Sequence, residues 1–181
     1  MSVNLKSLIG KLNSSTRGAV EDAAKLAMSR TNHYIEVEHF LRLLLDGTDN
    51  DFFYIANHYG VNADRLTQEV DISIDKLKRG NARTPGIGES VLKMMTEAWT
   101  IGSIEFNAGQ IRTGFALMAL LSNEDLSRQV KEFSKELLRR NRAPHRWHSR
   151  PRSLRRRHGQ GRFRQNSQPR RLHRKPHRKG P

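Results

Sequence analysis

Eight histidines and no cysteine limit the metal and nucleophile chemistry open to this sequence of 181 residues. Without cysteine there is no disulfide framework, no thiolate metal site and no cysteine nucleophile. His33 and His39 lie too far apart for one helix face, whereas a zinc-binding helix carries its histidines at positions i and i+4. We expect His39, in the stretch E-H-F-L, to pack or hydrogen-bond within the fold, and we expect no metal ion.

Motifs that hold a nucleotide or activate a nucleophile are also missing. The sequence has no G-x-x-x-x-G-K-[ST] phosphate loop, so it lacks the backbone cradle and the lysine that bind nucleotide phosphates. No nucleophile is paired with a recognisable base. His145 and His148 form an H-x-x-H pair, from which we expect adventitious metal binding at most. We therefore predict a protein that is not an enzyme and that takes no cofactor.

Basic charge is concentrated at one end of the sequence. Residues 1–141 hold 18 basic and 18 acidic residues, whereas residues 142–181 hold 13 Arg, 2 Lys and no acid. Only five of these forty residues are apolar, too few to offset the cost of ordering the backbone, about 1–2 kcal/mol per residue. We predict a neutral globular domain, residues 1–141, followed by a disordered arginine-rich tail, residues 142–181.

Three interpretations of the tail, Arg142–Pro181, stay open. Its charge suits a nucleic-acid arm, because binding a polyanion releases counterions, and the chain would then be a small nucleic-acid-associated protein. A membrane-surface anchor is disfavoured, because no apolar face accompanies the arginines. We favour a frame slip in a GC-rich gene, since the composition changes abruptly to Arg, His, Pro, Gln, Gly and Ser after KELLRRN.

The elements of residues 1–141 are predicted to be helices, because apolar residues recur at spacings of three and four and almost never alternate. One such stretch runs from Ala63 to Leu77 behind Asn62, a candidate N-cap. The segment Arg79–Gly88 contains three glycines and the only proline of the domain, so it separates two halves. The expected helices lie near residues 2–12, 15–30, 36–46, 50–58, 62–79, 88–104, 111–121 and 124–139.

The two halves are similar to each other. A shift of 76 residues places Ile35 on Ile111, Leu41 on Leu117 and Leu44 on Leu120. A two-fold repeat of a four-helix-type unit, residues 15–79 and 88–140, explains this, because stacking covers an apolar face that one unit leaves open. Two unrelated leucine-rich helices are the alternative. The predicted fold class is all-α.

The stretches TRGAVEDAAKLAMSRTNHYIEVEHFLRLLLD and SVLKMMTEAWTIGSIEFNAGQIRTGFALMALL carry a resemblance to a known family. Their A…A…LA spacing and the motif I-x-V-E-H-F-L resemble the two repeats of the Clp N-terminal domain, which precedes the ATPase modules of Clp-type AAA+ unfoldases. LKRGNARTP and the following AW…S.EF…IRTG are similar to the ClpV subfamily, which serves type VI secretion. The resemblance covers about residues 2–140.

This resemblance implies a cargo- or adaptor-recognition module. Domains of this family perform no chemistry and hand their cargo to the ATPase rings. In the type VI members the cargo is a short helical segment of the contractile sheath subunit. The implied partners are the sheath protein and, if the full-length gene is intact, the ATPase modules, whose phosphate loop we do not expect on this polypeptide.

The residues themselves offer a candidate docking place for such a helix. The expected N-terminal helix has an apolar stripe and lies outside both repeats, and the next helix has a face of small side chains that would let another backbone approach. Intramolecular packing of the same residues is the alternative. The candidate partner-binding residues are Leu5, Leu8, Ile9, Leu12, Ala19, Val20, Ala23, Ala24 and Ala27.

The segment between the halves is a second candidate surface. Arg83, Thr84 and Pro85 lie in it, and Arg83 could pair with a carboxylate of the cargo. A solvated linker is the alternative interpretation. No apolar run is long enough to span a membrane and no signal peptide is visible, so we expect a cytoplasmic protein without a membrane partner.

Overall fold

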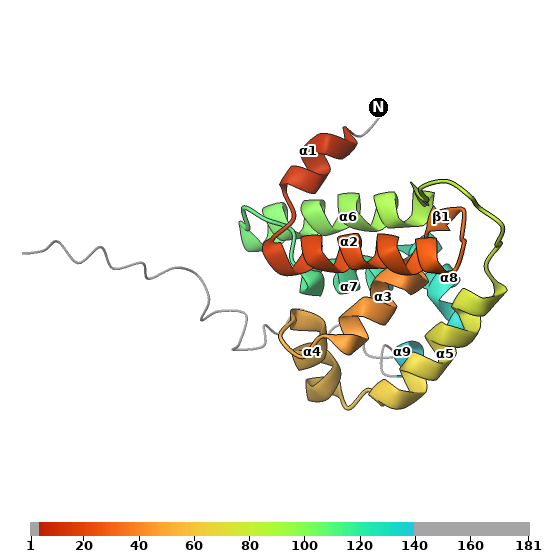
Figure 1. Ribbon diagram of the computed structural model, residues 1–181. Helices are drawn as coiled ribbons and strands as arrows, with labels where there is room; N and C mark the ends of the chain where they lie inside the picture. The colour runs from red at the N-terminus through yellow and green to blue at the C-terminus, as the bar shows by residue number, and fades with distance from the viewer. Residues whose placement is uncertain (1–3, 140–181) are drawn as a thin grey trace, which may run out of the picture.

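The computed structural model describes residues 4–139, so the predicted tail, His145 and His148 lie outside the described residues. Within this range the regular secondary structure is helical apart from two strands of two residues each (Figure 1). The elements are α1 (Leu5–Gly10), α2 (Ser14–Ser29), β1 (Tyr34–Ile35), α3 (Val37–Asp46), α4 (Asp51–Tyr59), α5 (Ala63–Lys76), β2 (Gly86–Ile87), α6 (Glu89–Phe106), α7 (Thr113–Ser122), α8 (Glu124–Phe133) and α9 (Glu136–Arg139).

Asparagine side chains set where many of these helices begin. Asn4, Asn13, Asn50, Asn62 and Asn123 each accept a hydrogen bond from a backbone N–H in the first turn of the following helix. Such bonds satisfy donors that the first turn otherwise leaves unpaired, which is why Asn62 could be recognised as an N-cap from the sequence.

The core lies where α2 packs on α3 and α6 packs on α7. Phe40, Leu41 and Leu44 of α3 are buried in the same cluster as Met94 of α6 and Leu120 of α7. These are the apolar positions that recur every three or four residues, so the all-α prediction is confirmed.

The offset of 76 residues reappears in the helices. Val37 and Thr113, which begin α3 and α7, are 76 residues apart, as are Asp46 and Ser122, which end them. The predicted domain and repeat boundaries themselves stay a prediction.

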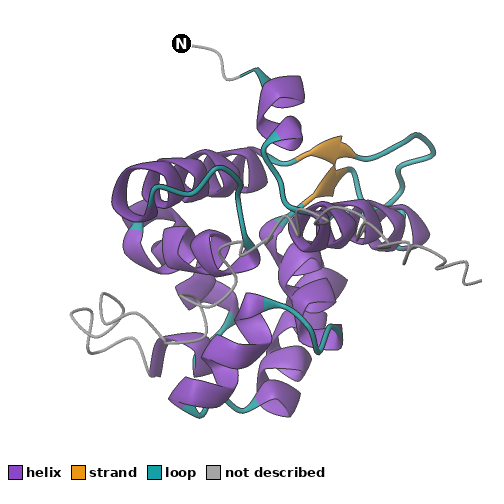
Figure 2. Cartoon of the chain, turned by 90° about the vertical axis from the view of Figure 1, so that its left-hand side faces the viewer, coloured by secondary structure: helices purple, strands orange, loops and turns teal. Residues whose placement is uncertain are grey.

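Short parallel pairings cross between the halves. Tyr34 pairs with Gly86 and Ile35 with Ile87, and Figure 2 shows these strands side by side. An isolated parallel bridge joins Leu12 to Ile111, where the Asn13 N–H donates to the Ile111 carbonyl at 2.9 Å. The segment before α2 is thus bonded to the second half of the chain, and the segment before α6 is bonded to the first half.

The expected final helix, 124–139, is divided in two. Ser134 has extended backbone angles, and its Oγ donates to Glu69 Oε2 at 2.8 Å, so α8 ends at Phe133 and α9 begins at Glu136. No helix within residues 4–139 combines the length and the hydropathy needed to cross a bilayer.

Candidate partner-binding site

α1 is held against the body by leucines on one of its sides. Leu8 is 6% exposed and belongs to the main core, and Leu12, two residues after the helix, is buried with it. Leu5 is 38% exposed. Because a helix of six residues has little stability of its own, these apolar anchors fix α1, which contacts α6.

The small side chains of α2 pack mainly inward. Ala23 and Ala27 are fully buried and form a cluster with Ile35. Their size lets the backbones of α2 and α3 approach closely, so this face serves internal packing. Three neighbouring residues at the edge of the contact are half-buried: Ala19, Val20 and Ala24.

Four of the nine predicted partner-binding residues are therefore interior, namely Leu8, Leu12, Ala23 and Ala27. The prediction that these four contact a partner does not fit the structure. The two leucines anchor α1 to the core, and the two alanines let α2 approach α3 closely. The other five are exposed or half-buried, and their contact with a partner stays a prediction. We refer to them as the α1–α2 surface: Leu5, Ile9, Ala19, Val20 and Ala24.

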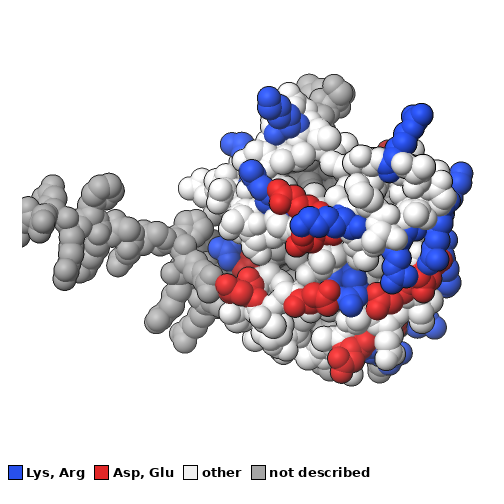
Figure 3. Space-filling model, viewed as in Figure 1, with Lys and Arg blue, Asp and Glu red and all other residues white. Residues whose placement is uncertain are grey.

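Charged side chains surround the α1–α2 surface. Figure 3 shows white surface beside α1, with basic side chains on α1 and both acidic and basic side chains over α2. Arg17 Nη2 donates to the Ile9 carbonyl at 3.2 Å. Lys11 Nζ lies 4.8 Å from the ring centroid of Trp99, a half-buried residue of α6 that packs against the core. Side chains of both charges therefore border these apolar residues.

The second candidate surface is an ordered loop rather than an open linker. The Asn81 side chain donates to the Arg83 carbonyl at 2.8 Å and to the Asn32 carbonyl at 3.2 Å, and accepts from the Arg83 N–H at 3.0 Å. Arg83 and Thr84 are exposed, whereas Pro85 is buried and does not fit a partner-contact role. The proposed pairing of Arg83 with a cargo carboxylate stays a prediction.

His39 lies inside the fold, as predicted. Its Nδ1 accepts a hydrogen bond from the Glu36 N–H at 3.0 Å, and its Nε2 lies 3.0 Å from Asn32 Oδ1. Nε2 therefore carries the proton. Burial, followed by the charge of Arg30, lowers the pKa of His39 to about 4. Nowhere in residues 4–139 do three His, Cys, Asp or Glu side chains gather as a metal ion would require.

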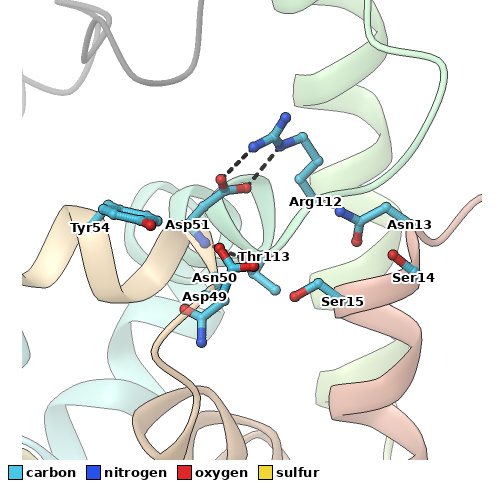
Figure 4. A pocket seen from close by; sticks show the side chains of 9 residues that line it. All are labelled: Asn13, Ser14, Ser15, Asp49, Asn50, Asp51, Tyr54, Arg112 and Thr113. Carbon is cyan, nitrogen blue, oxygen red and sulfur yellow. Dashed lines mark hydrogen bonds and ion pairs between the residues drawn. The ribbon is translucent and has the colours of Figure 1, made fainter. Parts of the chain in front are cut away.

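Sequence reasoning missed a polar hollow of about 370 Å³ where the N-termini of α2, α4 and α7 meet (Figure 4). On one wall Arg112 Nε donates to Asp51 Oδ2 at 2.9 Å, and a second guanidinium nitrogen donates to the other carboxylate oxygen. The Asp51 N–H donates to Thr113 Oγ1 at 3.0 Å. These groups satisfy one another and join α4 to α7, so the arrangement is structural. No sequence signal links residues so far apart.

A family assignment follows from comparison with known proteins. The model of the Clp repeat (R) N-terminal domain matches residues 11–133, so the chain belongs to the Clp N-terminal domain family. Domains of this family are substrate-binding rather than catalytic.

Two much longer proteins are similar to this chain over part of their length. The chain is 30% identical to the AAA+ ATPase ClpV1 of Pseudomonas aeruginosa over 129 residues, which is 71% of this chain and 14% of ClpV1. It thus spans about one seventh of that relative. It is 27% identical to the chaperone protein ClpB of Yersinia enterocolitica over 137 residues, or 76% of this chain and 15% of ClpB.

Solved structures share the fold over almost their whole length. One comes from work on the coevolution of the ATPase ClpV, the TssB–TssC sheath and the HsiE protein. It has a TM-score of 0.76 at 26% identity, covering 82% of this chain and 91% of that one. A complex of a ClpV N-domain with a VipB peptide has a TM-score of 0.63 at 25% identity, covering 79% and 91%.

Proposed function

We propose that this chain is the cargo-recognition module of a type VI secretion Clp unfoldase, and that it binds a helical segment of the sheath through the α1–α2 surface. One observation carries the proposal: a ClpV N-domain of the same fold was solved with a VipB peptide bound, and this chain covers 91% of that domain. The similarity to a ClpV structure studied together with the TssB–TssC sheath supports the same cargo.

The proposed contact lays a helix against apolar side chains of α1 and α2. Leu5 offers an apolar side chain on α1, and Ala19 and Ala24 on α2 are short enough to let a second backbone approach. A docked amphipathic helix would remove these side chains from water. This burial would stabilise the complex by about 25 cal/mol per Å² of apolar surface. α1 lies outside the paired halves and would supply Leu5 to this contact.

The proposal assigns ATP hydrolysis to modules outside these residues. ClpV1 is an AAA+ ATPase, and this chain matches 14% of it. We therefore expect the full chain to bind a sheath peptide without hydrolysing ATP. A cytoplasmic location, expected from the sequence, belongs to the same proposal.

Fluorescence anisotropy of a labelled sheath-subunit peptide, titrated with the full chain, tests this function. Ala24→Glu and Leu5→Asp should each weaken binding at least about tenfold, because the new carboxylate would be desolvated without a partner. Tyr54→Asp on α4 makes the same kind of change at an exposed large hydrophobic residue of another surface, and it should leave the affinity unchanged. Unchanged affinity in both test variants would remove the α1–α2 surface as the docking place.

Salt dependence separates this function from nucleic-acid association. Binding through an apolar surface should change little as salt rises, whereas binding through residues 142–181 should fall by orders of magnitude. A peptide affinity that collapses with salt and ignores Ala24→Glu would contradict the proposed function.

A further inference from the structure

A second hollow, of about 270 Å³, lies between α5 and α8, which belong to different halves of the chain. It is remote from α1 (Figure 1). Its walls carry three carboxylates and one ammonium group, so its charge is negative and would repel an anion. The lining residues used below are Glu38, Glu69, Ile72, Lys76, Glu132 and Phe133.

Glu38 brings a poorly satisfied carboxylate to this hollow. The residue is 5% exposed, and its Oε1 accepts a hydrogen bond from Ser73 Oγ at 3.1 Å. Its Oε2 is buried and accepts no hydrogen bond from any other residue in the described part of the chain. Burial, with a smaller contribution from the charge of Glu132, raises the pKa of Glu38. A buried oxygen without a donor costs about 1–3 kcal/mol, so a donor entering the hollow would be favoured.

The remaining carboxylates differ in what they already bind. Glu69 Oε2 accepts from Ser134 Oγ at 2.8 Å and from the Glu136 N–H at 3.0 Å, so this carboxylate is satisfied. Glu132 is exposed and forms no ion pair within residues 4–139. Glu38 and Glu132 are thus the acceptors that a ligand would meet.

Apolar side chains complete the hollow. Ile72 of α5 is 57% exposed, and Phe133 of α8 is half-buried against the core. Long basic side chains place their methylene stem on such surfaces and keep the charged head among polar groups.

We propose that this hollow binds the guanidinium or ammonium head of a long basic side chain, through Glu38 and Glu132, with its stem along Ile72 and Phe133. Two sources carry this chemistry. One is a basic residue of a partner protein, and the other is an arginine of this chain's own residues 142–181, which hold 13 of them.

Agmatine, an alkyl-guanidinium with a four-carbon stem, is the probe for this site. Titrated into the ¹⁵N-labelled full chain, it should cause saturable NMR shifts at the amides of Glu38, Ser73 and Glu132. Glu38→Gln keeps the shape and the Ser73 contact but removes the charge, so it should weaken agmatine about tenfold. Glu132→Gln changes only the exposed rim, so it tests the site without risk to the fold. The control Glu105→Gln, outside the hollow, should change nothing.

A second arm identifies the source. In a chain with Gln in place of the 13 arginines of residues 142–181, tighter agmatine binding, or binding seen only there, would show that those arginines compete for the hollow. Equal binding in both chains would assign the site to a partner's side chain. Absence of saturable shifts at these amides in both chains would overturn the proposal and leave sheath binding untouched.

Discussion

His39 makes the stability of this domain depend on pH in a predictable way. It occupies the third position of α3, where its Nδ1 accepts the Glu36 N–H while the Glu36 side chain caps the helix. Protonation of Nδ1 would remove that acceptor and place a charge in a fully buried side chain. Acidification should therefore weaken the start of α3 and its contact with Asn32.

The size of the effect follows from the pKa of His39 in the two states. It is 6.5 in the unfolded chain and about 4 in the fold. The unfolded chain binds the proton more readily, so the free energy of unfolding falls as the pH drops from 6.5 to 4 and levels off below that. At 1.36 kcal/mol per pKa unit, the contribution present above pH 6.5 and lost by pH 4 is about 3 kcal/mol.

Urea unfolding at several pH values between 7 and 4 measures this loss. His39→Gln is the matched variant, because glutamine at this position can complete the same capping box and does not titrate. Subtracting its curve from that of the unmodified protein cancels the titration of Asp and Glu residues. The unmodified protein should lose about 3 kcal/mol more than the variant over this range. Parallel curves would refute the assigned role of His39.

Three substitutions test the packing described above. Asp51→Ala leaves the guanidinium of Arg112, the N-cap residue of α7, without its partner, and should lower the free energy of urea unfolding by about 2–4 kcal/mol; a change near zero would show that the pair contributes nothing. Gly102→Ala would bring a Cβ to 2.8 Å from Phe115 Cδ2, and should lower the thermal midpoint by an amount equivalent to about 1–3 kcal/mol. Leu8→Ala should lower the free energy of unfolding by about 2–4 kcal/mol and speed hydrogen exchange in α1. Unchanged exchange would mean that Leu8 does not anchor α1.

Local signals explain how much of the fold could be predicted. α3 was expected at 36–46 and lies at Val37–Asp46, because its leucine spacing and its boundaries are properties of neighbouring residues. β1 and β2 were missed, since strands of two residues show no periodicity and pair only after the halves meet. The break at Ser134 was missed because its cause, a hydrogen bond to Glu69, comes from another helix.

The candidate site was predictable only in part, for a related reason. Helical spacing shows that Ala23 and Ala24 lie on neighbouring parts of one helix, yet it does not say which part α3 covers. Ala23 proved to be interior and Ala24 half-buried. The Asp51–Arg112 pair likewise depends on tertiary structure that brings α4 and α7 together.

The bridge between Leu12 and Ile111 bears on how the chain acquires its structure during synthesis. The hydrogen bonds that fix the segment before α2 are made with Ile111, which the ribosome adds much later. The first half must therefore wait, with part of its apolar surface uncovered, until that later segment leaves the exit tunnel. Such long-range closure slows folding and prolongs the exposure of apolar surface in the nascent chain.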